Sequence, residues 1–231
     1  MIHKALHKVR HHVRRILHHV GPEGHRHRNI IATFAEKTGL VYFGTVDQHR
    51  DDHEIVRGLT ASSTHQDDHY CVGSVNGYDI HLVDRNDSKE DYEGTLQQHH
   101  LIIFQIKLHT ARPIHHFLMT PHGSKETQFT SLFTAASSHL QSVPLGSIGE
   151  YTQDFLSRYE LRSMPTHFID TEILMSSDVA RSIAAHFWPL ALEVWDNSLY
   201  IYSTDTHVTT HLLDTMMQNG LWLAGQIDKK E

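Results

Sequence analysis

The chain has 231 residues, a formal net charge of −7 and 39% hydrophobic residues, a composition that supports a buried core and excludes a wholly disordered chain. Its single cysteine, Cys71, excludes an intrachain disulfide and a cysteine-based zinc site. No run reaches the roughly 18 apolar residues that a membrane-spanning helix needs, and the N-terminus lacks the apolar core of a secretory signal. We therefore expect a cytoplasmic protein.

The charge is distributed unevenly along the chain. Residues 1–28 contain seven Lys or Arg and one acid, Glu23, which gives +6, so the remaining 203 residues carry −13. Within residues 2–20, apolar side chains recur at helical spacing between basic residues and histidines, which predicts a basic amphipathic helix. The residues expected to bind a membrane are Lys4, Leu6, Lys8, Val9, Arg10, Val13, Arg14, Arg15, Ile16 and Leu17.

Two interpretations of this helix stay open. A basic helix with one apolar stripe is typical of attachment to an anionic membrane surface, here the inner face of the membrane. The same stripe could instead pack on the acidic body or on a second copy of the chain, which would be self-association through residues 2–20. Nucleic acid is a weaker candidate partner, because aromatic residues do not alternate with the basic ones.

The body, residues 29–231, is expected to form a single domain that follows the N-terminal helix and linker at 1–28. Asn76-Gly77 lies between two alternating apolar runs, which predicts a hairpin over 70–84. A second hairpin is expected over 190–203. Further strands are predicted at 40–43, 54–60, 100–108, 113–119 and 158–162, and polar residues predict a loop at 86–98. Helices are predicted at 29–38, 126–140, 165–175, 177–186 and from 204 or 205 to about 227.

These elements indicate the fold class α+β. Consecutive strands are joined mostly by turns, which favours a mainly antiparallel sheet, and the helices gather toward the ends of the chain.

Several short segments resemble a group of uncharacterised bacterial proteins whose domain begins with Phe-Ala-x-x-x-Gly-Trp-x-Tyr. The matching segment is Phe34–Tyr42, in which Leu40 replaces the usual Trp. Weaker similarities are Val56-Arg57-Gly58, Gly77-Tyr78-Asp79, Phe155–Leu161 and Leu192–Ile201. The resemblance implies neither an activity nor a cofactor. It does imply membrane proximity, because members often carry membrane-spanning helices before the Phe-Ala motif.

The 24 histidines raise the possibility of a metal site. Three pairs in the body have His-x-x-x-His spacing, His49/His53, His65/His69 and His207/His211, which is a modest excess over chance. A mixed zinc site from His49, His53, His65, Asp67 and His69 in loops 47–53 and 65–69 is one interpretation. The other is that these are ordinary solvated loop residues, and we then expect no cofactor.

Enzyme motifs are weak in this sequence. Gly73-Ser74-Val75-Asn76-Gly77 does not have serine at the centre, as a Gly-x-Ser-x-Gly elbow requires, and Cys71 lies where a packed thiol is ordinary. The preferred function is therefore a non-enzymatic protein, peripherally membrane-associated or scaffold-like through its basic helix. The alternative is an enzyme or metal-binding module built on the two His/Asp loops.

Overall fold

The computed structural model describes residues 22–44, 56–60, 65–90, 96–111, 114–123, 133 and 137–229. Residues 1–21, with the predicted basic helix, lie outside this range, as do His49 and His53. None of the described helices is long and apolar enough to cross a membrane.

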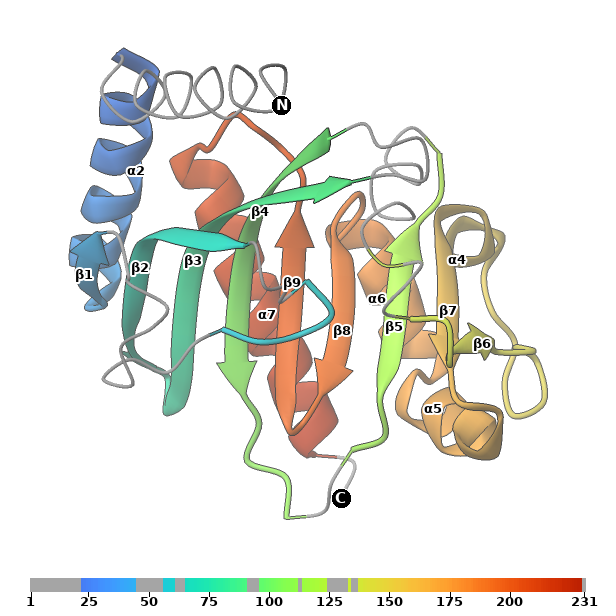
Figure 1. Ribbon diagram of the computed structural model, residues 1–231. Helices are drawn as coiled ribbons and strands as arrows, with labels where there is room; N and C mark the ends of the chain where they lie inside the picture. Colours follow the sequence, from blue (N-terminus) through green and yellow to red (C-terminus); the bar gives the residue numbers. More distant parts are fainter. Residues whose placement is uncertain are drawn as a thin grey trace.

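The described strands form one nine-stranded sheet in the order β1-β2-β3-β4-β9-β8-β5-β7-β6 (Figure 1). Every neighbouring pair is antiparallel, which confirms the predicted α+β class with an antiparallel sheet. The strands are β1 (Val41–Gly44), β2 (Gln66–Val75), β3 (Tyr78–Glu90), β4 (Leu96–Lys107), β5 (Phe117–Pro121), β6 (Gln141–Ser142), β7 (Tyr159–Ser163), β8 (Ala191–Trp195) and β9 (Ser198–Ser203).

Helices cover one face of the sheet. They are α2 (Pro22–Thr38), α4 (Gln153–Arg158), α5 (Phe168–Leu174), which follows the short 3-10 helix η1 (Pro165–His167), α6 (Ser177–His186) and α7 (Thr210–Asp228). In Figure 1, α6 and α7 lie behind the sheet and α2 lies at its β1–β3 end. Buried residues of α2, α4, α6 and α7 join alternate residues of the strands, such as Leu82 and Phe104, in the main core.

A second, smaller core lies on the opposite face of the sheet. Val83, Leu101 and Ile103 face this side, as the period of two predicts for the neighbours of Leu82 and Phe104. Val56 and Phe133, from segments between strands, cover them. The sheet therefore has buried residues on both faces, covered by helices on one and by residues from segments between strands on the other.

The hairpin over 70–84 is confirmed. Val75 pairs with Tyr78 across Asn76 and Gly77, whose φ angles of 52° and 86° are those of a type I′ turn. The second hairpin, β8–β9, is also confirmed and closes on Asp196 and Asn197, again at positive φ.

Three predicted segments are wrong in type. The loop expected at 65–69 is strand from Gln66 onward, because Gln66, Asp67 and Asp68 of β2 pair with β3. The loop expected at 86–98 is largely strand, because β3 continues to Glu90 and pairs residue by residue with β4 from Leu96 onward. The strand expected at 54–60 is not a strand in its described part, 56–60. There Gly58 has a φ of +88°, and an added Cβ would collide with the Tyr202 hydroxyl.

Other differences concern helix boundaries. α2 begins at Pro22, earlier than the predicted residue 29, and so runs across the predicted boundary at residue 28. α7 begins at Thr210, later than predicted, because the Thr209 side chain caps it by accepting from the Leu212 N–H. α4 was not expected. Most of the predicted helix 126–140 lies outside the described residues.

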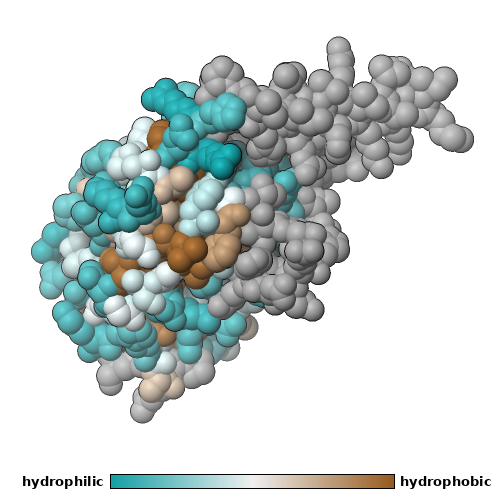
Figure 2. All heavy atoms as spheres, turned by 90° about the vertical axis from the view of Figure 1, so that its left-hand side faces the viewer, coloured by the Kyte–Doolittle hydropathy of each residue, from teal (hydrophilic) through white to brown (hydrophobic). Residues whose placement is uncertain are grey.

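The β1 end of the sheet is an exposed edge. Val41 and Phe43 of β1 are 56% and 46% exposed. The face of the molecule that carries α2 and β1 shows hydrophobic residues grouped inside a hydrophilic surround (Figure 2). With only four residues, β1 offers a short pairing edge, which limits unwanted strand addition.

We expect Gly77→Val to lower the free energy of unfolding by about 1–3 kcal/mol, because a β-branched residue is strained at positive φ. Urea denaturation measures the change. Asn76→Gly is the control, since glycine adopts the same turn angles. An unchanged midpoint for Gly77→Val would contradict the type I′ turn.

Candidate functional site

A cluster of polar residues interrupts the helix-covered core where β3 and β4 run past α2. Asp84 belongs to the same alternating set of β3 as Ile80 and Leu82, and His100 to the same set of β4 as Ile102 and Phe104. Asp84 pairs with Ile102 in the ladder, so His100 is its diagonal neighbour on the same face. The strand register therefore places an acid and an imidazole together beneath the helix layer.

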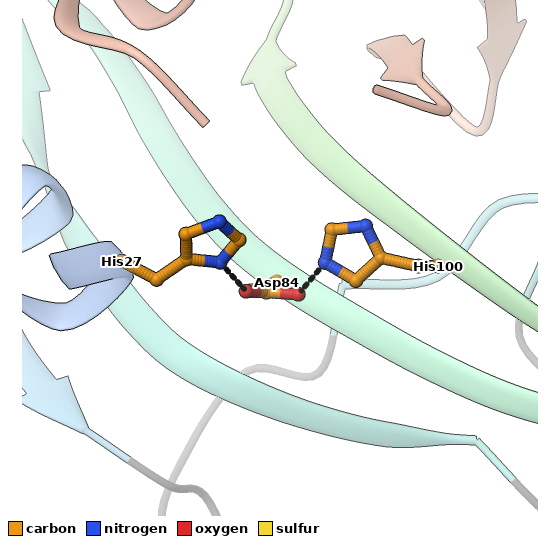
Figure 3. A group of neighbouring side chains, drawn as sticks. All are labelled: His27, Asp84 and His100. Carbon is orange, nitrogen blue, oxygen red and sulfur yellow. Dashed lines mark ion pairs between the residues drawn. The ribbon is translucent and has the colours of Figure 1, made fainter. Parts of the chain in front are cut away.

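α2 supplies the third member of the cluster. His27 lies four residues before Ile31 and seven before Phe34, both fully buried against the sheet, and so follows the inward face of the helix. The His27 Nδ1 lies 3.8 Å from Asp84 Oδ2, and the His100 Nε2 lies 2.6 Å from Asp84 Oδ1. Figure 3 shows the two rings on opposite sides of the carboxylate.

The ionisable groups of this cluster shift the pKa values of Asp84 and His100. Burial by itself raises the pKa of Asp84, but the imidazoles of His100 and His27 outweigh it and hold the pKa well below its ordinary value. Burial likewise opposes the protonated form of His100, and the neighbouring Asp84 more than compensates, so the pKa of His100 is raised. Asp84 and His100 therefore each stabilise the charged form of the other.

A second buried acid faces the same side of the sheet. Asp68 of β2 is the ladder partner of Asp84, and the two are 2% and 4% exposed. Acids directly opposite each other on neighbouring strands repel, and both Asp84 and Asp68 raise the pKa of the His100 imidazole, whose positive form they attract.

A pocket of about 690 Å³ lies beside the cluster. Its lining comes from α2, the ends of β3 and β4 and the segment before α7. The lining residues are Arg26, His27, Asn86, Gln98, His99, His100 and residues 206–209. The two imidazoles that flank Asp84 are thus reachable from this pocket, although Asp84 itself is buried.

The predicted loop site has a different arrangement. His65 Nε2 lies 3.9 Å from Asp67 Oδ2, but both Asp67 oxygens accept from Arg85, at 2.6 Å from Nε and 2.7 Å from Nη2. His69 bonds through Nδ1 to the Tyr42 hydroxyl at 2.7 Å. Among the described residues, His65, Asp67 and His69 are not gathered into one group of potential ligands.

The Arg85 guanidinium is fully buried on the face opposite Asp84. Besides Asp67, it donates to Thr60 Oγ1 at 3.1 Å and to the Val56 carbonyl. Arg85 thus fixes the irregular segment 56–60 over the sheet, and Asp67 is its counter-ion.

Glu193 forms another buried polar centre on that face. It is 0% exposed and interacts with His116 Nε2 at 2.8 Å, accepts from the Leu59 N–H at 3.0 Å, and accepts from the Tyr202 hydroxyl. These contacts again secure the segment around Gly58, so Glu193 has a structural role.

Cys71 is fully buried, and burial raises the pKa of its thiol to about 12. A thiol held protonated at neutral pH is a poor nucleophile, in line with the packing role expected for it.

A further histidine group lies at the surface. The rings of His115 and His167 stack with centroids 3.5 Å apart, and each lies 3.7 Å from Asp170. The side chains of His115 and Asp170 are 46% and 60% exposed, so this group is hydrated, unlike the one at Asp84.

The residues of the Asp84 cluster were not singled out from the sequence. His27 and His100 are 73 residues apart, and no short motif joins them to Asp84. The one local signal was an acid in the inward-facing register of a hydrophobic strand, Ile80-x-Leu82-x-Asp84.

Comparison with known proteins relates the chain to others by its fold. No family model matches, and no curated protein matches. The crystal structure of the mycobacterial trehalose monomycolate transport factor A, TtfA, is similar with a TM-score of 0.54 at 10% sequence identity. The match covers 88% of this chain and 93% of that chain. At this identity the similarity shows a shared fold.

Removing the Arg85 charge tests the Asp67 assignment. We expect Arg85→Met to reduce the free energy of unfolding by about 3–5 kcal/mol, because Asp67 is left buried without its counter-ion. The double variant Arg85→Met/Asp67→Leu should recover much of the loss. Urea denaturation of wild type, Arg85→Met, Asp67→Leu and the double variant gives the coupling energy, and additive effects would contradict a direct pair.

Proposed function

We propose that the protein is a non-enzymatic accessory or scaffold protein, held at an anionic membrane surface by residues 2–20. The single observation that supports this most is the contrast between +6 on residues 1–28 and −13 on the rest of the chain. A basic segment on an acidic body is attracted to anionic lipid while the body is repelled, so the segment attaches and the body faces away.

The fold adds support of a general kind. The similar structure belongs to a protein named as a transport factor. We take that name as support for an accessory role. In the described residues, the buried charged groups Arg85 and Glu193 bond to the segment 56–60. Those contacts suit a rigid platform for binding partners.

Vesicle co-sedimentation of the full chain tests the proposal. With anionic vesicles, we expect Lys4→Gln/Lys8→Gln/Arg10→Gln to weaken binding roughly a hundredfold, since each basic residue contributes about 1 kcal/mol. The matched control is Arg57→Gln/Lys107→Gln/Arg181→Gln, which removes the same charge from the body and should bind as wild type.

Two results would count against membrane attachment. One is equal sedimentation of wild type and the N-terminal variant. The other is no sedimentation of either, which favours packing of residues 2–20 on the body or on a second copy; a change in oligomeric state of Leu6→Asp/Val13→Asp would identify the second copy.

Binding should strengthen as the pH falls from about 7.5 to 5.5, because histidine titrates near pH 6.5. Residues 2–20 contain six histidines, His3, His7, His11, His12, His18 and His19. An anionic surface favours their protonated form and so raises their pKa in the bound state, which means that added protons promote binding. Replacing all six by Gln should leave binding at pH 7.5 and abolish its pH dependence; an unchanged dependence would refute the histidine effect.

A further inference from the structure

We infer that His27, Asp84 and His100 bind a divalent transition-metal ion between α2 and the sheet. This inference goes beyond the proposed function and uses none of the residues in the predicted loops 47–53 and 65–69. It also departs from the expectation of no cofactor. The three side chains come from α2, β3 and β4, and each can offer one ligand atom with all three atoms within 4.8 Å of one another.

The spacing of the ligand atoms suits a small ion. Ligands about 2.0–2.1 Å from a tetrahedral zinc lie about 3.3 Å from each other. The separations here, 2.6 Å from His100 Nε2 to Asp84 Oδ1 and 3.8 Å from His27 Nδ1 to Asp84 Oδ2, lie on either side of that value. Small side-chain rotations therefore suffice to admit an ion where the two rings converge on the carboxylate (Figure 3).

Burial makes the Asp84 carboxylate dependent on partners inside the protein. Asp84 is 4% exposed, and its two oxygens face the His100 and His27 imidazoles at 2.6 Å and 3.8 Å. A buried carboxylate needs a compensating positive charge, and a metal ion held by the same three side chains would supply it.

The surrounding charge points to a cation rather than to a neutral ligand. Asp68 is buried directly opposite Asp84 on the same side of the sheet. Two carboxylates and two neutral imidazoles balance the charge of one divalent ion, and an imidazole that holds a second proton releases it when it binds the ion.

The donor set selects the class of metal. Two imidazoles and one carboxylate are ligands typical of Zn²⁺ and Fe²⁺ sites, whereas Ca²⁺ and Mg²⁺ prefer oxygen ligands alone. Three protein ligands leave a coordination position free, and the 690 Å³ pocket that His27 and His100 line gives an ion and a water molecule access to it.

Cobalt(II) is the probe, because its visible absorption in a tetrahedral site distinguishes a built site from scattered surface histidines. We expect tag-free full-length protein to bind one Co²⁺ with a tetrahedral spectrum that Zn²⁺ abolishes by displacement. His27→Gln should weaken Co²⁺ binding by at least about a hundredfold, since loss of a direct ligand exceeds the usual effect of losing an outer-shell contact. His100→Gln should do the same.

Two matched controls separate this site from others in the chain. His167→Gln removes a histidine from the exposed His115/His167/Asp170 group, and His49→Gln/His53→Gln removes the pair in the predicted loop. Both should keep the spectrum and the stoichiometry of wild type. As a second measurement, Zn²⁺ should raise the Tm of wild type and of both controls but not that of His27→Gln, whose own Tm reports folding.

The inference is overturned if His27→Gln and His100→Gln, folded as judged by Tm, bind Co²⁺ like wild type. It is equally overturned if the spectrum disappears in either control, which assigns the ion elsewhere, or if wild type gives no tetrahedral spectrum. Vesicle binding is measured separately on Lys4→Gln/Lys8→Gln/Arg10→Gln, which should retain the Co²⁺ site, so failure of one proposal is distinct from failure of the other.

Discussion

Two consecutive side chains of β3, Asp84 and Arg85, carry opposite charges into opposite faces of a sheet that is covered on both sides. Because neither face gives them water, each charge must find its partners within the protein. Arg85 finds Asp67, Thr60 and the Val56 carbonyl, and so holds the irregular segment that covers the smaller core. Asp84 finds two imidazoles beneath α2 and so brings a helix and two strands together. Because the side chains of β3 alternate between the two faces of the sheet, this one strand helps to fix the cover of the smaller core on one face and the polar cluster beneath α2 on the other.

Much of the sheet could be predicted from local patterns. The Asn76-Gly77 turn and the apolar run of β4 can each be recognised from a few consecutive residues, and both predictions were confirmed. The extension of β3 and β4 through 86–90 and 96–98 was missed, because its residues are polar and charged. There the backbone ladder between two long strands overrides side-chain preference. Residues 56–60 show the opposite failure, because their apolar and β-branched residues predicted a strand that does not form. Contacts with the side chains of Arg85 and Glu193 hold this segment in place instead of strand pairing.

The candidate site could not be found by the same means. A search for histidines four residues apart detects ligands that share a helix face, whereas His27, Asp84 and His100 meet through strand register and helix docking. Asp67 illustrates the converse error. It lies between two histidines in the sequence, yet its carboxylate belongs to Arg85, 18 residues away. Arg85 is the ladder partner of Asp67, so strand register, and not closeness along the chain, decides which group this carboxylate meets.

The strand order has a consequence for how the molecule is made. β8 and β9, the last two of the described strands in chain order, lie in the middle of the sheet, where β4 pairs with β9 and β5 with β8. The portion ending at β4 and the portion running from β5 to β7 therefore have no direct sheet contact with each other until the C-terminal hairpin enters between them. During synthesis, β4 and β5 therefore each keep one unpaired edge until the residues of β8 and β9 have emerged. Until then these edges are open to unwanted strand pairing, whatever the stability of the folded protein.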